Sequence, residues 1–240
     1  MFAFDHSHSA FETELKRHVK GDRVDYSSWK KNRTGLDLYL RTLSELTPTE
    51  FERFTDSEKL AFWINAYNAF TVRLILDREP VRSIRDIERF GGGPWKLEFF
   101  SVFGVTRNLD WIEHEILRKE FSEPRIHFAI NCASLSCPPL SKEAYKAARL
   151  EAQLTRAAER FLSDPARNRY DSSRKILYLS KIFHWFRSDF VREFPDLRTF
   201  YNVHSGLAPV PSAAEIHFLN YDWGLNRVGD SKNLEKKRQF

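Results

Sequence analysis

The chain has 240 residues, of which 42% are hydrophobic and 30% charged, a balance that is typical of a globular protein with a sizeable core. Its net charge of +5 comes from basic residues spread along the whole sequence, so a nucleic-acid groove, which needs clustered basic residues beside exposed rings, is not expected. No run reaches the roughly 18 apolar residues of a membrane span, and two cysteines are too few to indicate the redox compartment.

The N-terminal half of the chain is predicted to be helical. Apolar spacing favours helices over residues 11–19 and 35–46. The longest helix is expected to follow Thr55, which forms a capping-box sequence with Glu58, and to end near Arg78 because a proline follows. A glycine-rich turn at residues 91–94 then separates the two halves of the chain.

The second half mixes strands and helices without a βαβ rhythm, which predicts an α+β fold. The expected form is a helix-rich single domain over residues 1–229 with a small, mainly antiparallel sheet, followed by a polar C-terminal tail at 230–240. Strands are predicted over residues 98–102, 105–107, 126–131, 175–179 and 216–221, and helices over 109–121 (capped by Asn108), 150–162 and 198–203.

The segment RIHFAINCASLSCPP, residues 125–139, holds both cysteines and is the first candidate for chemistry. Cys132 ends a predicted strand, and a loop that follows a strand leaves backbone donors free for a developing oxyanion. Two other interpretations stay open. Free cysteines are often buried and inert, and a Cys132–Cys137 disulfide would close a very small loop.

A thiolate nucleophile needs a base, and two histidines are the main candidates. His114 lies on a helix that is apolar on two sides, so its ring needs a polar partner. His127 precedes Cys132, but in a regular strand the two side chains point to opposite faces, so a direct pair would need a bulge. The other histidines considered are expected to be exposed N-terminal residues or packing residues: His6, His8, His18 and His184.

A zinc site is a competing arrangement of the same segment. His114, His127, Cys132 and Cys137 could supply four ligands. Their spacing, H-x12-H-x4-C-x4-C, lacks the close CxxC pairs of common structural zinc sites. We therefore predict no metal and no cofactor.

Asn65 and Asn68 interrupt the most apolar helix of the sequence and share one side of it. A buried carboxamide without a partner costs about 1–3 kcal/mol, so both are expected to bind loop backbone or a polar side chain. The loop of Cys132 is the natural candidate, although the two asparagines could only fix a neighbouring turn.

Five ordered segments resemble the domain of unknown function 547 family. They are KLAFWINAYNAF at 59–70, WIEHEILR at 111–118, RIHFAINCASLSCPPL at 125–140, LSKIFHWFRSDF at 179–190 and YDWGLN at 221–226. The matching pattern includes Asn65, Asn68, His114, His127 and Cys132. The resemblance implies a bacterial member of the exported type, and it favours Cys132 over Cys137, whose position is not always cysteine in the family.

These observations lead to two hypotheses from different classes. The first is a cysteine-dependent hydrolase or acyl-transfer enzyme acting on an amide, peptide or thioester, with Cys132 as nucleophile, His114 or His127 as base, and Asn65 or Asn68 as orienting residue. The second is a non-catalytic module of the cell envelope that binds a peptide or another small ligand. The protein is expected to be periplasmic or secreted if a signal peptide precedes this numbering, and cytoplasmic otherwise.

Overall fold

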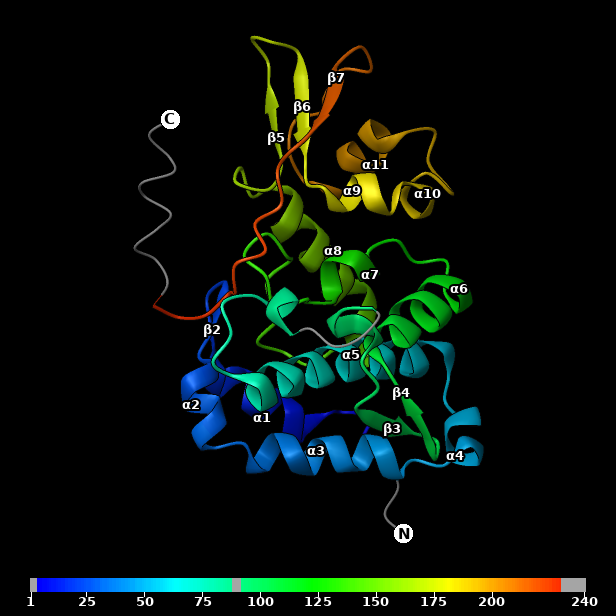
Figure 1. The fold of residues 1–240 in the computed structure, drawn as a ribbon. Coiled ribbons are helices and arrows are strands. Elements are labelled where there is room, and N and C mark those ends of the chain that lie inside the picture. Colours follow the sequence, from blue (N-terminus) through cyan, green and yellow to red (C-terminus); the bar gives the residue numbers. More distant parts are fainter. Residues whose placement is uncertain (1–3, 88–91, 230–240) are drawn as a thin grey trace.

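Helix α5 (Asp56–Arg78) is the centre of the fold, and the computed structural model places the other N-terminal helices around it (Figure 1). The structure describes residues 4–87 and 92–229. The helix begins as predicted, because the Thr55 side chain accepts a hydrogen bond from the Glu58 backbone and the Glu58 side chain accepts one from the Thr55 backbone. Most of its residues are buried on all sides, so any polar group on it must find a partner from another segment.

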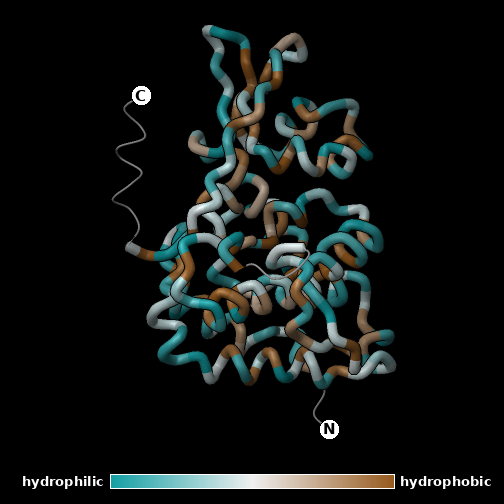
Figure 2. Tube along the Cα trace, in the orientation of Figure 1, coloured by the Kyte–Doolittle hydropathy of each residue, from teal (hydrophilic) through white to brown (hydrophobic). Residues whose placement is uncertain are grey.

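The elements around α5 form the larger hydrophobic core of the molecule. The predicted helices α1 and α3 and the predicted hairpin β3–β4 are confirmed, whereas the short α2 and α4 were not predicted. In Figure 2 hydrophobic and hydrophilic residues alternate along α3, as expected of a helix with one face on a core. The elements are α1 (Ser9–His18), β1 (Val19–Lys20), β2 (Arg23–Val24), α2 (Tyr26–Lys31), α3 (Thr34–Glu45), α4 (Pro48–Glu52), β3 (Phe100–Val102) and β4 (Val105–Arg107).

The C-terminal elements build a second hydrophobic cluster beside the first. Strand β6 pairs with β5 antiparallel and with β7 parallel, and helices α8 to α11 pack near this sheet (Figure 1). The elements are a π-helical segment (Trp111–Leu117) that continues into α6 (Arg118–Glu120), α7 (Ile126–Ala129), α8 (Leu150–Leu162), β5 (Arg169–Asp171), β6 (Ile176–Leu179), α9 (Ile182–Trp185), α10 (Arg187–Phe190), α11 (Leu197–His204) and β7 (Glu215–Phe218). Single 3₁₀ turns occur at Ile84–Asp86, Pro94–Lys96 and Ala147–Arg149.

The fold class is α+β, a helix-rich single domain with small sheets that are mainly antiparallel, as predicted. The predicted helices over 109–121, 150–162 and 198–203 and the strands near 175–179 and 216–221 are present within a few residues. Among residues 4–87 and 92–229, no helix is long and apolar enough to span a membrane. The predicted tail at 230–240 and part of the glycine-rich turn lie outside the described residues.

The predicted strand over residues 126–131 is wrong, because Ile126–Ala129 forms the short helix α7. Its first turn closes through backbone bonds from Ile126 to Glu123 and from His127 to Pro124, and a proline suits the first turn of a helix. The run IHFAI is buried between the two clusters on every side. A short apolar run that is buried all round carries no period that would separate strand from helix.

Two N-terminal histidines that were expected to be exposed are buried. His8 lies beneath Tyr39, whose hydroxyl is 2.7 Å from its Nδ1, and burial lowers the pKa of His8 to about 4. His18 stacks on Trp29 with ring centroids 4.9 Å apart. The His18 ring packs without a hydrogen bond to either nitrogen among the described residues, whereas His8 keeps its bond to Tyr39. Composition alone does not reveal such buried histidines.

Candidate active site

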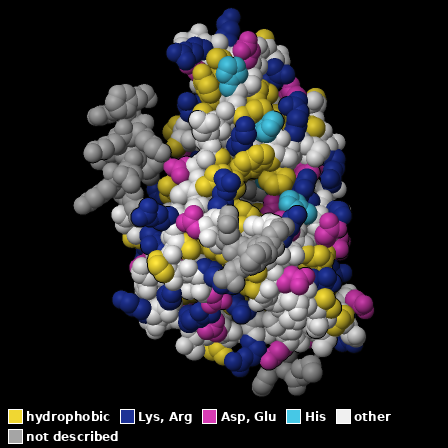
Figure 3. All heavy atoms as spheres, viewed as in Figure 1, with side chains coloured by type: hydrophobic (Ala, Val, Ile, Leu, Met, Phe, Trp, Pro, Cys, Tyr) yellow, Lys and Arg dark blue, Asp and Glu magenta, His cyan; other side chains and the backbone are white. Residues whose placement is uncertain are grey.

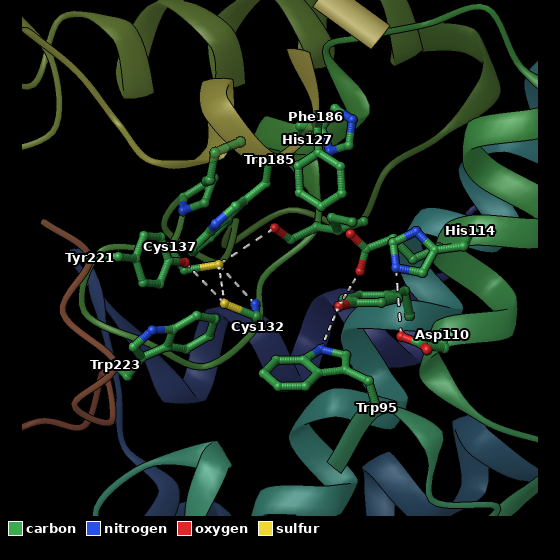
Figure 4. Close-up of a pocket in the computed structure, with 15 residues that line it drawn as sticks. Trp95, Asp110, His114, His127, Cys132, Cys137, Trp185, Phe186, Tyr221 and Trp223 are labelled. Atoms are coloured by element: carbon green, nitrogen blue, oxygen red, sulfur yellow. Dashed lines mark hydrogen bonds and ion pairs between the residues drawn. The ribbon is translucent and has the colours of Figure 1, made fainter. Parts of the chain in front are cut away.

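A cavity of about 240 Å³ lies where the two hydrophobic clusters meet. Figure 3 shows hydrophobic side chains gathered around a hollow on this face of the molecule, and Figure 4 shows the side chains that line it. The polar lining residues are Asp110, Glu113, His114, His127, Cys132 and Cys137, and the aromatic ones are Tyr67, Trp95, Trp185, Phe186, Tyr221 and Trp223. Apolar walls with a few convergent polar groups are typical of a small-molecule site.

The sulfur of Cys132 has three polar neighbours in this cavity. Its Sγ lies 2.9 Å from the Sγ of Cys137, 3.1 Å from the Ser134 hydroxyl and 3.2 Å from the Tyr221 hydroxyl. Burial opposes ionisation of the thiol, but the hydrogen bonds from these three groups outweigh it and lower the pKa of Cys132 to about 7. Burial and its role as hydrogen-bond donor raise the pKa of Cys137, so Cys132 is the thiol of the pair that ionises at the lower pH.

The loop that presents Cys132 is held by side chain to backbone hydrogen bonds. The Asn131 carboxamide accepts from the Ala133 amide at 2.9 Å and donates to the Pro138 carbonyl at 2.7 Å. The Ala133 carbonyl accepts from the Asn226 amide at 3.0 Å. Ala133 is in the left-handed region with φ 60°, which costs about 1–2 kcal/mol for a residue with a Cβ. Such conformations are often found at functional sites.

Asn68 supports this loop directly, whereas Asn65 does not. Asn68 donates to the Ala129 carbonyl at 3.0 Å and accepts from the Asn131 amide at 2.8 Å. Asn65 makes the same pair of bonds to the backbone of Tyr145, at 2.8 and 2.9 Å. Both carboxamides therefore bind loop backbone, as expected, but only Asn68 fixes the segment that leads into the candidate nucleophile.

His127 lies on α7 and belongs to a buried charge network. Its Nε2 donates to the carboxylate of Asp189 at 2.8 Å, and Arg118 binds the same carboxylate through two nitrogens at 2.6 and 3.0 Å. Burial lowers the pKa of His127, although Asp189 opposes the shift. The ring stacks on Phe186 with centroids 4.2 Å apart. His127 is thus a neutral imidazole with one nitrogen bound to a carboxylate.

His114 lies at the opposite side of the cavity from Cys132 (Figure 4). Its Nδ1 is 3.0 Å from an Arg118 nitrogen and its Nε2 is 3.6 Å from the Asp110 carboxylate. Both ring nitrogens therefore face a charged partner. Among the described residues no hydrogen bond joins Cys132 to His114 or to His127, although all three line the same cavity.

Glu113, next to His114, also lines the cavity. Its carboxyl accepts from the Tyr67 hydroxyl at 2.9 Å, and Tyr67 in turn accepts from the Trp95 indole at 3.2 Å. Burial raises the pKa of Glu113. The surrounding turn is π-helical, a distortion that is frequent at functional sites.

Four site residues were missed from the sequence: Asp110, Glu113, Asp189 and Tyr221. A sequence signal existed for the first two. Asp110, Glu113 and His114 stand at positions i, i+3 and i+4, which share one face of a helix. Asp189 and Tyr221 lie inside segments that resemble the family. However, no motif or spacing in the sequence indicates that Asp189 contacts His127 or that Tyr221 contacts Cys132.

The four zinc ligands considered from the sequence do not converge. In the part of the chain that the structure describes, no group of three or more His, Cys, Asp or Glu side chains is arranged to hold a metal ion. His127 is hydrogen-bonded to Asp189, and the thiols of the two cysteines are hydrogen-bonded to each other.

The thiolate character of Cys132 leads to a testable pH profile. Iodoacetamide alkylation of the folded protein should rise with pH and reach half its maximum near pH 7, because the thiolate is the reacting form. The urea-unfolded chain should react with a midpoint of about 8.5. Ser134→Ala and Tyr221→Phe should each move the folded midpoint upward. A midpoint near the unfolded value would contradict the assignment.

Comparisons with known proteins give a family and no activity. None of the curated proteins and none of the solved structures compared with the chain matches it. A family model matches residues 51–162, which include α5, both candidate histidines and the Cys132 loop, whereas Asp189 and Tyr221 lie outside the matched segment. The matched family is described as protein of unknown function, DUF547, and the match covers slightly less than half of the chain.

Proposed function

We propose that the protein is a cysteine-dependent hydrolase or acyl-transfer enzyme that acts on a small-molecule or peptide substrate through an amide, peptide or thioester bond. One observation carries the proposal. A cysteine whose neighbours favour its thiolate lies on the wall of an aromatic cavity that also holds a carboxylate-bound imidazole. A nucleophile, a base and a group that orients the base are the parts that nucleophilic acyl transfer needs.

In the proposed reaction the neutral imidazole takes the proton of the Cys132 thiol, and the sulfur attacks the carbonyl carbon of the substrate to form a tetrahedral intermediate. The bond to the leaving amine or thiol then breaks, and the leaving group takes a proton from the imidazolium. The resulting thioester on Cys132 is cleaved by water or by an acceptor nucleophile, whose proton returns to the imidazole. The sulfur leaves as thiolate and takes the proton back from the imidazolium, so the enzyme is regenerated.

We assign the base role to His127 rather than to His114. The Nε2 of His127 is bound to Asp189 at 2.8 Å, which fixes the tautomer and leaves Nδ1 as the proton acceptor. In His114 the Nδ1 already accepts from Arg118. Catalytic hydrogen bonds often tighten only in the substrate complex, so a base that shares the cavity with the thiolate without a direct bond fits this role.

The covalent intermediate gives the decisive test. The reduced protein is mixed with p-nitrophenyl acetate, and acylation is located by intact-mass and peptide-mass measurement. We expect a single acetyl group on Cys132 that hydrolyses with time, and no such adduct in Cys132→Ala. His127→Asn should slow both steps. If the folded protein acylates no faster than the urea-unfolded chain, the proposal fails.

The aromatic wall favours a second candidate, a non-catalytic module that binds a peptide or another small ligand. The ring centroids of Trp185, Tyr221 and Trp223 lie 4.5 to 5.6 Å apart in a cluster beside Cys132, and Trp185 is exposed. Such platforms bind ligands without chemistry. Ligands that quench tryptophan fluorescence equally in wild type and Cys132→Ala, without any acyl adduct, would favour this alternative.

A further inference from the structure

We propose that Cys132 and Cys137 form a redox pair, in which a hydroperoxide oxidises Cys132 and Cys137 then closes an intrachain disulfide. Both cysteines are free thiols on one short loop, with their sulfurs 2.9 Å apart. The pair lines the cavity (Figure 4). The redox chemistry needs no substrate of the proposed acyl-transfer reaction and is independent of it.

The fold brings the two sulfurs together before any oxidation. The Cys132 amide donates to the Cys137 sulfur at 2.9 Å, and the Cys137 amide donates to the Ser134 carbonyl at 3.2 Å. The Asn131 carboxamide spans the loop to the Pro138 carbonyl. A disulfide has a sulfur separation of about 2.05 Å, so bond formation requires an approach of roughly 1 Å within a loop that is already closed.

The two thiols differ in a way that assigns their roles. Cys132 is partly exposed to the cavity, whereas Cys137 is 4% exposed. Neighbouring donors lower the pKa of Cys132 to about 7 and burial raises the pKa of Cys137. A thiol whose pKa is close to the ambient pH is the optimal attacking group. Cys132 therefore meets the oxidant, and Cys137 is the resolving thiol.

The reaction balances as a two-electron oxidation. The Cys132 thiolate attacks the terminal oxygen of the hydroperoxide, the O–O bond breaks, and the alkoxide that leaves takes up a proton to become an alcohol. Cys132 is then a sulfenic acid. The Cys137 sulfur attacks the Cys132 sulfur, the S–O bond breaks, and the hydroxyl leaves with the Cys137 proton as water. Two thiols are oxidised and one hydroperoxide is reduced.

The disulfide has a consequence that rests on the proposed function. It removes the Cys132 thiolate from the cavity, so acyl transfer would stop until a thiol reductant restores both cysteines. Acylation is measured on reduced protein without oxidant, and disulfide formation is measured as a mass change without an acyl donor. Failure of one proposal is thus distinguishable from failure of the other.

The test uses the full chain, whose only two cysteines make every intrachain disulfide a Cys132–Cys137 bond. Reduced protein is treated with hydrogen peroxide or cumene hydroperoxide, blocked with iodoacetamide and measured by intact mass. We expect loss of both alkylatable thiols, a mass lower by two hydrogens, and full recovery with dithiothreitol. Thiol loss in folded protein at pH 7 should be several-fold faster than in urea.

Single-cysteine variants separate the two roles. Cys137→Ser should stop at the sulfenic acid, which dimedone traps on Cys132, and Cys132→Ser should leave Cys137 alkylatable after the same treatment. Circular dichroism checks that each variant is folded, and the wild-type mass change does not depend on either. Oxidation of wild-type Cys132 to sulfinic acid while Cys137 stays alkylatable would overturn the proposal, as would no oxidation of Cys132.

Discussion

Replacement of Asp189 by asparagine is expected to lower the free energy of unfolding by about 3 kcal/mol, near the lower end for breaking a buried ion pair. Asp189 accepts from His127 at 2.8 Å and from Arg118 at 2.6 and 3.0 Å. These partners hold its pKa well below the usual range. An asparagine cannot accept all three bonds, so a cation stays partly buried without its counter-charge. Urea unfolding monitored by circular dichroism measures the loss.

The same substitution should reduce the rate of Cys132 acylation by about a hundredfold or more, because the base loses the carboxylate that fixes its tautomer. Asp196→Asn is the matched control. Asp196 binds Arg198 at 2.6 Å and caps α11, so its loss should cost stability without changing acylation. If Asp110→Asn slows acylation more than Asp189→Asn does, the base is His114 and the assignment of His127 is wrong.

Replacement of Asn68 by alanine is expected to cost about 3 kcal/mol of unfolding free energy, because it leaves two buried backbone groups without partners at roughly 1–3 kcal/mol each. Those groups are the Ala129 carbonyl and the Asn131 amide. With the loop released, the donors around Cys132 no longer converge. The alkylation midpoint of Cys132 should therefore move from near pH 7 toward about 8.5.

Asn65 offers an internal control for this prediction. Asn65→Ala removes an equivalent pair of bonds, to the amide and carbonyl of Tyr145, and should cost a similar amount of stability. It should leave the alkylation midpoint of Cys132 where it was. Equal shifts of the midpoint in both variants would show that general destabilisation, and not support of the loop, controls the thiol.

The candidate active-site residues lie where the two hydrophobic clusters meet. The thiolate and its loop are attached to α5 through Asn68, whereas Asp189 lies on α10, which packs with the second cluster. Arg118 joins the parts by binding both Asp189 and His114. The side chains of such a site are held in place by packing in both hydrophobic clusters, which favours a fixed geometry over a mobile one.

Local chemistry made several features predictable. The capping box at Thr55 predicted where α5 begins, and Pro80 predicted its end near Arg78, since both signals depend on neighbours within four positions. The need of Asn65 and Asn68 for partners also followed from the sequence, because polar groups on a helix that is buried all round must be satisfied. The strand predicted over 126–131 failed because its apolar run has no period.

The sequence by itself indicated Cys132, His127 and His114 as candidates for chemistry, from residue type, spacing and the family resemblance. Only the tertiary structure decided their partners. Asp189 meets His127 across 62 positions, and Tyr221 meets Cys132 across 89. Apolar periodicity specifies which face of an element is buried but not which distant segment covers it. Cys137 and Ser134, which also lower the pKa of Cys132, are its neighbours in the sequence, whereas the hydrogen bond from Tyr221 arises only when the two clusters pack.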